Sequence, residues 1–241
     1  ILKTLELDVP DSMEEVRALL PVLHRYGMNF NHYAANTGSY KGFSVTLPAV
    51  VQSGGTMYLS GSAKTTLGEE PALEGIRALT NDFTVYGMEY EVASFFQSFR
   101  DGTLPLGTSN MSTYLLLLNA APEIAGQWAI APYPGETDEN GETRRWTCNS
   151  GESSVIFSSG DHQQEAWRFL DWYMSDAAQT EFGHRLQATM GNEYLWNSAN
   201  LNAFLASSWP TGDKRVIAEQ LQWTYEHSRM MGAYMVEREL S

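Results

Sequence analysis

"SFFQSFRDGTLPLGTSNMSTY", residues 94–114, reads as a helix, a glycine turn, a short strand and the start of a second helix. Phe95, Phe96 and Phe99 form the apolar stripe of the first helix, and Asp101-Gly102 is a helix stop signal. Residues 104–107 are too few for anything but a strand, and Asn110 is a typical cap for the helix that follows. The strand therefore ends in the polar run Gly-Thr-Ser-Asn, with the aromatic Tyr114 about one turn beyond it.

The composition predicts a folded, acidic protein. The chain has 241 residues, of which 43% are hydrophobic, and its net charge is −14. We expect no binding to nucleic acid or to anionic membranes, because a strongly negative protein is repelled by both. The single cysteine, Cys148, excludes an internal disulfide and a cysteine-based metal cluster. The opening residues lack the basic start and long apolar region of a signal peptide, and lack an initiator Met, so we expect a mature product or an excised piece.

The pattern along the chain alternates between strands and helices and then becomes helical. The sequence predicts helices over residues 13–26, 44–52, 69–86, 91–100 and 110–121, and an Asn140-Gly141 hairpin. It predicts strands at 126–135 and 153–159, and then helices at 161–174, 175–190, 199–206 and 213–228. Trp167 and Trp172 have core spacing and are predicted to be structural. Such an order is typical of an α/β layered fold.

Motifs for catalysis are weak. No glycine-rich phosphate loop and no Gly-x-Ser-x-Gly elbow occurs, and the five histidines are scattered. We therefore expect no metal site and no cofactor. Acid pairs such as Glu89 with Glu91, or Glu237 with Glu239, could serve a glycosidase, but such spacings are common on solvated surfaces.

A succession of short motifs carries a family resemblance. In chain order they are VPDSMEEVRALLPVL, QSGGTMY, SFFQSFRDGTLPLGTSNMSTY, APEIAGQWAIAPYPG, SSVIFSS, EAWRFLDWYMSDAAQTEFG and MGAYMVEREL. This order closely resembles the extracellular solute-binding proteins (family 1) of carbohydrate ABC importers, the group that includes maltodextrin-binding protein. Ser12-Met13 stands where Thr-Trp is usual in that family. A stretch of a hundred or more residues that normally precedes this region in the family is absent from the sequence.

The resemblance implies an α/β fold of the type 2 periplasmic-binding-protein class, rich in helices. Residues 9–146 would form the C-terminal lobe, residues 150–210 part of the N-terminal lobe, and residues 211–241 a return to the C-terminal lobe. The resemblance implies non-catalytic binding of a solute, a carbohydrate in this family, by a clamp that closes between two lobes. The implied partners are that carbohydrate and an ABC permease, outside the cell or in the periplasm. A lipoprotein anchor or the permease, both outside this chain, would provide any membrane association.

Ligands of open α/β lobes lie outside the carboxyl ends of the strands, which points to the polar strand end at Asn110. Tyr114 could there offer a flat face to a pyranose ring, while Asn and Ser side chains bind its hydroxyls. Alternatively, Asn110 is only a helix cap and Tyr114 a core residue. The resemblance adds further ligand-binding candidates: Asn36, Tyr40, Phe43, Ser44 and Tyr234.

Three other functions remain open at the level of the sequence. A glycoside hydrolase would need two carboxylates facing one pocket. A binding protein for a non-sugar solute would keep the fold without aromatic rings across its cleft. A scaffold or adhesin would bind no small molecule.

Overall fold

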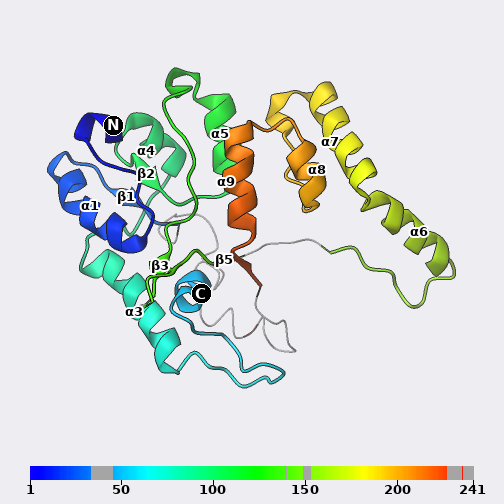
Figure 1. Cartoon of the computed structure of the whole chain (residues 1–241), viewed down its shortest axis with the longest axis horizontal. Helices are drawn as coiled ribbons and strands as arrows, with labels where there is room; N and C mark the ends of the chain where they lie inside the picture. The colour runs from blue at the N-terminus through cyan, green and yellow to red at the C-terminus, as the bar shows by residue number, and fades with distance from the viewer. Residues whose placement is uncertain (34–45, 139, 149–152, 227–234, 236–241) are drawn as a thin grey trace. The chain divides into compact units, whose positions relative to one another are not determined.

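The computed structural model describes residues 1–33, 46–138, 140–148, 153–226 and 235 (Figure 1). The chain divides into two compact units. The first unit comprises Ile1–Leu117, Ala131–Asn149 and Gln220–Ser241, and the second comprises Leu118–Ile130 and Ser150–Glu219. The chain thus passes between the units four times. The assignment of residues 9–146, 150–210 and 211–241 to lobes stays a prediction, and residues 118–130 group here with the second unit.

The first unit contains short helices and strands in alternation. Its helices are η1 (Leu2–Leu5), α1 (Met13–Arg25), α2 (Leu47–Gln52), α3 (Glu70–Thr84), α4 (Phe95–Asp101) and most of α5 (Met111–Ala120). Its strands are β1 (Phe30–Asn31), β2 (Leu106–Gly107), β3 (Glu136–Thr137), β4 (Thr143–Arg144), β5 (Thr147–Cys148) and β6 (Thr224–Tyr225). The second unit is helical in its described part: η4 (Pro122–Ile124), α6 (Gln163–Tyr173), α7 (Asp176–Met190), η5 (Asn192–Tyr194), α8 (Leu201–Ala206) and most of α9 (Thr211–Leu221).

The strands form three two-stranded ladders. β1 pairs with β2 and β5 pairs with β6, both in parallel, whereas β3 and β4 form an antiparallel hairpin. The hairpin confirms the prediction at Asn140-Gly141, and Gly141 has the positive φ of 82° that this tight turn requires. Parallel pairs need long crossover connections, and helices of the first unit supply them for β1 and β2.

The sequence predicts a cap at Asp11 or Ser12 and apolar residues at helical spacing for helix α1, and the structure has both. The hydroxyl of Ser12 accepts a hydrogen bond from the backbone N–H of Glu15, and this side-chain cap satisfies one of the free donors of the first turn. Apolar side chains recur on one face of the helix, and that face joins a core cluster with Phe30 of β1 and Met88. The buried residues of α1 are Met13, Val16, Leu20 and Leu23.

A second core cluster lies between α2 and α3, where the backbones approach closely. A Cβ atom added to Gly75 of α3 would collide with the backbone of Ala49 in α2. Glycine at this position therefore lets the two helices pack in contact. The cluster contains Leu47, Val50, Val51, Met57 and Ala72, and Trp146 and Tyr225 pack against it.

Several sequence predictions were wrong in detail. Residues 126–135 form no strand; only Gly135 makes an isolated bridge, to Ser12. The helix predicted over 213–228 ends at Leu221, because Thr224 and Tyr225 pair with β5 instead. Residues 153–159 are in no strand, and the predicted core residues Trp167 and Trp172 are 64% and 60% exposed. A strand is stable only when a neighbouring strand pairs with it, and none of the described residues pairs with residues 153–159.

Candidate functional site

The parallel strands β1 and β2 end at the same edge of the first unit, and polar residues follow both. The two strand ends are joined by backbone and side-chain hydrogen bonds. Thr108 N donates to the carbonyl oxygen of Asn31 at 2.8 Å, and Asn31 Nδ2 donates to the carbonyl oxygen of Thr108 at 2.9 Å. The backbone N–H of Tyr33 donates to the Thr108 hydroxyl at 3.0 Å. Hydrogen bonds therefore join the segment after β1 to the segment after β2.

Gly107 permits this close approach. A Cβ atom at Gly107 would lie 2.5 Å from Cβ of Asn31 and 2.9 Å from the ring of Phe95. Real Cβ atoms do not approach so closely, so any larger residue would push the ends of β1 and β2 apart. The glycine of the Gly-Thr-Ser-Asn run thus has a packing role, and the three polar residues after it remain at the edge.

Asn110 caps α5 and also contacts an aromatic ring. Its Oδ1 accepts a hydrogen bond from the backbone N–H of Thr113 at 3.2 Å, and its Nδ2 donates to the Tyr33 hydroxyl at 3.3 Å. Ser109 donates to the Thr113 hydroxyl at 2.7 Å. Ser109 and Asn110 are exposed, and Tyr33 is half-buried. A ring, a hydroxyl and an amide therefore lie together at this strand edge, reachable from solvent.

Tyr114, the aromatic predicted to stack on a sugar, is only 6% exposed. In this structure it packs in the interior, one turn into α5. Its role as a ligand contact stays a prediction, as does that of Asn110. The other predicted ligand residues, Asn36, Tyr40, Phe43, Ser44 and Tyr234, lie outside the described residues.

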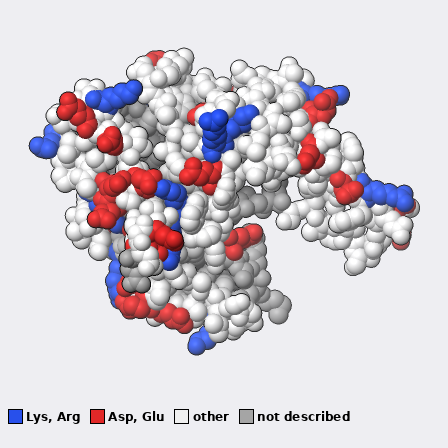
Figure 2. Space-filling view, viewed as in Figure 1, with Lys and Arg blue, Asp and Glu red and all other residues white. Residues whose placement is uncertain are grey.

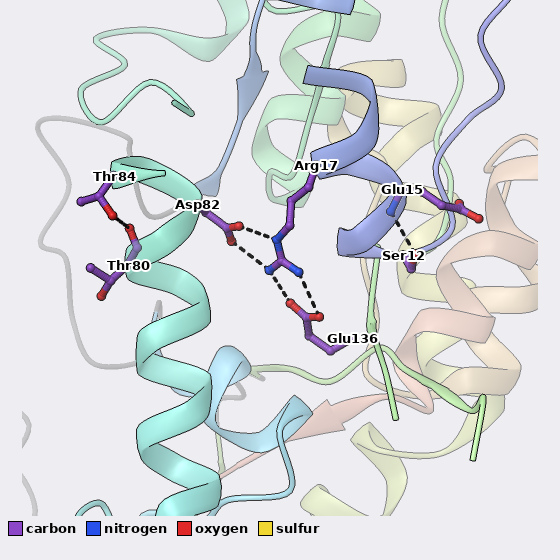
Figure 3. A network of polar contacts seen from close by, with 7 residues as sticks. All are labelled: Ser12, Glu15, Arg17, Thr80, Asp82, Thr84 and Glu136. Atoms are coloured by element: carbon purple, nitrogen blue, oxygen red, sulfur yellow. Dashed lines mark hydrogen bonds and ion pairs between the residues drawn. The ribbon is translucent and has the colours of Figure 1, made fainter. Parts of the chain in front are cut away.

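A buried ion cluster joins three elements of the first unit (Figure 3). Arg17 on α1 binds Asp82 on α3 through Nε at 2.7 Å and Glu136 on β3 through Nη2 at 2.6 Å. The Asp82 side chain is 3% exposed and that of Arg17 15%. Burial acts to lower the pKa of Arg17, but the hydrogen bonds and charges of both carboxylates outweigh it and raise that pKa. Burial raises the pKa of Asp82, and the contact with Arg17 opposes this rise only in part.

A cavity of about 20 Å³ lies beside the ion cluster. His32, Gln52, Asp82, Tyr133 and Glu136 supply its polar lining. Burial, assisted by the positive charge of Arg17, lowers the pKa of His32 to about 4, so this histidine is neutral at pH 7. Burial likewise raises the pKa of Tyr133. The cavity has room for a water molecule and not for a sugar ring.

Two carboxylates, those of Asp82 and Glu136, line the cavity. Asp82 and Glu136 are close together, but both are bound by the guanidinium of Arg17. Within the described ranges, no group of three or more His, Cys, Asp or Glu could hold a metal ion. In the same part of the chain, no helix combines the length and hydropathy that a membrane crossing needs.

Sequence reasoning missed two features of this region. Tyr33 has a local signal, an aromatic residue two positions after the end of β1, that the sequence prediction did not use. The cluster of Arg17, Asp82 and Glu136 has no local signal, because Arg17 is 65 residues from Asp82 and 119 residues from Glu136 in the sequence.

Comparison with known proteins identifies the fold. No family model and no curated protein matches the sequence. Solved structures do match: an ABC transporter solute-binding protein from Thermotoga lettingae bound with α-D-tagatose has a TM-score of 0.66 at 12% identity, covering 99% of this chain and 60% of that one. An ABC substrate-binding protein from Listeria monocytogenes in complex with cycloalternan has a TM-score of 0.61 at 13% identity, covering 98% and 59%.

The GacH receptor of Streptomyces glaucescens, solved unliganded and with acarbose, has a TM-score of 0.62 at 12% identity and covers 98% of this chain and 58% of its own. The predicted α/β solute-binding-protein fold is therefore confirmed. The chain spans about three fifths of the length of the solved structures that it matches.

Proposed function

We propose that this chain is the greater part of an extracytoplasmic solute-binding protein that delivers a carbohydrate to an ABC permease. One observation carries the proposal: nearly the whole chain follows the fold of three ABC-type binding proteins, each solved with a sugar or a sugar-like ligand. The protein would bind and release its ligand without breaking a bond.

The strand edge of the first unit supplies chemistry that suits a carbohydrate. The half-buried ring of Tyr33 offers an apolar face, and the C–H face of a pyranose packs well on such a ring. Ser109 and Asn110, both exposed, provide a hydroxyl and an amide for the sugar hydroxyls. The edge needs little rearrangement to bind, because hydrogen bonds between Asn31, Tyr33 and Thr108 already hold it.

Further ligand contacts are proposed from the sequence. The strand-end position adds Tyr114 to Asn110, and the family resemblance adds Asn36, Tyr40, Phe43, Ser44 and Tyr234. Lobe closure over a solute would bring a second set of contacts to the ligand, and the closed form would dock on the permease. A lipid anchor outside this chain would tether the protein to the cell surface.

A thermal-shift screen of carbohydrates tests the function. The full-length product of the gene is heated with mono- and oligosaccharides, including tagatose, cycloalternan and acarbose. A ligand present at a hundred times its dissociation constant stabilises the folded protein by about 2.7 kcal/mol, which gives a clear rise in melting temperature. The proposal predicts that at least one carbohydrate produces this rise and that none is consumed.

Paired variants locate the binding. Tyr33→Ala and Asn110→Ala should each weaken the binding of the carbohydrate by about 5- to 30-fold, since each removes a contact worth roughly 1–2 kcal/mol. Tyr26→Ala is the matched control, because Tyr26 is also in the first unit and is 61% exposed. If amino acids or peptides stabilise the protein and no carbohydrate does, the sugar assignment is wrong. Turnover of an aryl glycoside would instead establish a hydrolase.

A further inference from the structure

Thr108 follows strand β2, and its hydroxyl contacts the segment that follows strand β1. The residue is buried, with 7% of its surface exposed. The hydroxyl accepts a hydrogen bond from the backbone N–H of Tyr33 at 3.0 Å and lies 3.5 Å from the carbonyl oxygen of Asn31. One buried hydroxyl group therefore contacts the backbone at two positions of that segment, residues 31 and 33.

Asn31 bonds to the same residue from the end of β1. Its Nδ2 donates to the carbonyl oxygen of Thr108 at 2.9 Å, and Asn31 is fully buried. Its Oδ1 has no hydrogen-bond partner among the described residues. A buried carbonyl oxygen without a donor is destabilising and rare in folded proteins. The fold therefore keeps, at a cost in stability, a side chain that bonds to Thr108, and such local costs are typical of functional sites.

Tyr133 contacts Thr108 from the side of the ion cluster. Its phenol lines the cavity together with Asp82 and Glu136 and is hydrogen-bonded to the Thr108 side chain. Burial, assisted by the negative charges of the two carboxylates, raises the pKa of this phenol, so it stays a neutral hydroxyl. A threonine side chain has few rotamers, and a fixed partner at its hydroxyl selects one of them. Tyr133 therefore orients the Thr108 hydroxyl.

The side chains that the strand edge presents to solvent are uncharged. Tyr33, Ser109 and Asn110 offer a ring, a hydroxyl and an amide, whereas Asp and Glu side chains gather in patches on the viewed face of the first unit (Figure 2). Hydrogen bonds between neutral groups weaken steeply when their geometry departs from the optimum. The affinity of such an edge for a solute therefore depends on where the backbone holds these groups.

Tyr33 is held at both ends, by Thr108 at its backbone and by Asn110 Nδ2, which donates to its hydroxyl at 3.3 Å. A shift of the Tyr33 backbone would therefore displace the ring and the amide together. We propose that Thr108 is a positioning residue of the solute site: its hydroxyl, oriented by Tyr133, fixes the Tyr33 backbone so that the ring and the Asn110 amide meet a carbohydrate together. This inference rests on the proposed function, and it adds Thr108 and Tyr133 to the residues that set the affinity.

Substitutions at Thr108 test the proposal in the full-length product of the gene, by calorimetric titration with the carbohydrates of the thermal-shift screen, among them tagatose, cycloalternan and acarbose. Thr108→Val removes the hydroxyl and keeps the shape of the side chain, and it should weaken each carbohydrate that the wild type binds by about 3- to 10-fold. Thr108→Ser keeps the hydroxyl and should bind within about twofold of the wild type. Thr66→Val is the matched control, because Thr66 is also a buried threonine of the first unit whose hydroxyl is hydrogen-bonded, to Thr56; it should lower the melting temperature and leave the affinity unchanged.

Double-mutant cycles show whether Thr108 acts through the ring of Tyr33. Once Tyr33→Ala has removed the ring, Thr108→Val should change the affinity by less than about twofold, because no ring is left to position. Tyr133→Phe should weaken binding by about 3- to 5-fold by itself, and by less than about twofold when Thr108→Val is already present. Hydrogen exchange needs no carbohydrate: the Tyr33 amide should exchange at least about tenfold faster in Thr108→Val than in the wild type, and at an unchanged rate in Thr108→Ser.

Several results would each overturn the inference. Thr108→Val binds as tightly as the wild type, or leaves the exchange of the Tyr33 amide unchanged; it weakens binding equally with and without the Tyr33 ring; Thr66→Val weakens binding as much; or Tyr133→Phe has its full effect when Thr108→Val is present. In all of these the wild type still binds a carbohydrate, and the proposed function stands. A wild type that binds no carbohydrate of the screen would overturn the proposed function, and this inference with it.

Discussion

Removal of Arg17 should destabilise the first unit because it leaves two carboxylates together without their cation. Arg17 joins α1 to α3 and to β3, and its partner Asp82 is 3% exposed at the side chain. An uncompensated buried charge typically costs about 3–5 kcal/mol. Glu136 is 25% exposed, so water solvates it in part and its share of the loss is small. We therefore expect Arg17→Met to lower the free energy of unfolding by about 3–5 kcal/mol at pH 7, mostly through Asp82.

The pH dependence of this loss follows from Asp82. The contact with Arg17 lowers the pKa of Asp82, while burial, the larger effect, raises it. Without Arg17 only the raising effect remains, so Asp82 binds its proton at a higher pH in the variant than in the wild type. A carboxyl whose folded pKa is raised stabilises the fold at low pH and loses that contribution as pH rises. The difference in free energy of unfolding between Arg17→Met and the wild type should accordingly become smaller as the pH falls from 7 toward 4.

The assay is urea unfolding, monitored by hydrogen exchange of peptides from α1 and α3, which reports on the first unit alone. The double variant Arg17→Met/Asp82→Asn, which removes both charges, should recover at least half of the lost stability at pH 7. Arg77→Met is the matched control: Arg77 also forms an ion pair from α3, with Glu70, but is 59% exposed, so little change is expected. A loss below about 1 kcal/mol for Arg17→Met, or no recovery in the double variant, would refute the reasoning.

Three further predictions concern the interior of the first unit. Because the pKa of His32 is lowered to about 4 in the folded protein, the unfolded chain binds a proton at His32 at a higher pH than the folded chain does. Between pH 7 and pH 4 the free energy of unfolding of the wild type, measured with urea, should therefore fall by about 3 kcal/mol more than that of His32→Gln. An equal fall in the variant would contradict this. Gly75→Ala should lower the free energy of unfolding by about 1–3 kcal/mol, because its Cβ meets the backbone of Ala49, whereas Gly212→Ala, with open space around it, should not. Burial raises the pKa of the half-buried Cys148 to about 12, so iodoacetamide at pH 8 should label it far more slowly in the folded protein than in the unfolded chain, and equal labelling rates would contradict this.

The sequence predicted the elements whose signals are local. A cap at Asp11 or Ser12, the apolar face of α1 and the Asn140-Gly141 hairpin depend on residues within a few positions of one another. All three are present in the structure, with Ser12 as the cap. A strand within residues 104–107 was also predicted, and β2 (Leu106–Gly107) lies there; so was Asn110 as the cap of the next helix.

The tertiary structure alone decided features that depend on distant neighbours. Thr224 and Tyr225 leave a helical pattern because β5 offers them a strand to pair with. Arg17 binds Asp82 and Glu136, which lie 65 and 119 residues away in the sequence. Tyr33 is hydrogen-bonded to Asn110, 77 residues away. The strand pattern of residues 153–157 is the converse case, since no strand of the described chain lies beside it. Local spacing sets which conformations a segment favours, but burial and strand pairing are properties of pairs of segments, and only the folded chain brings those pairs together.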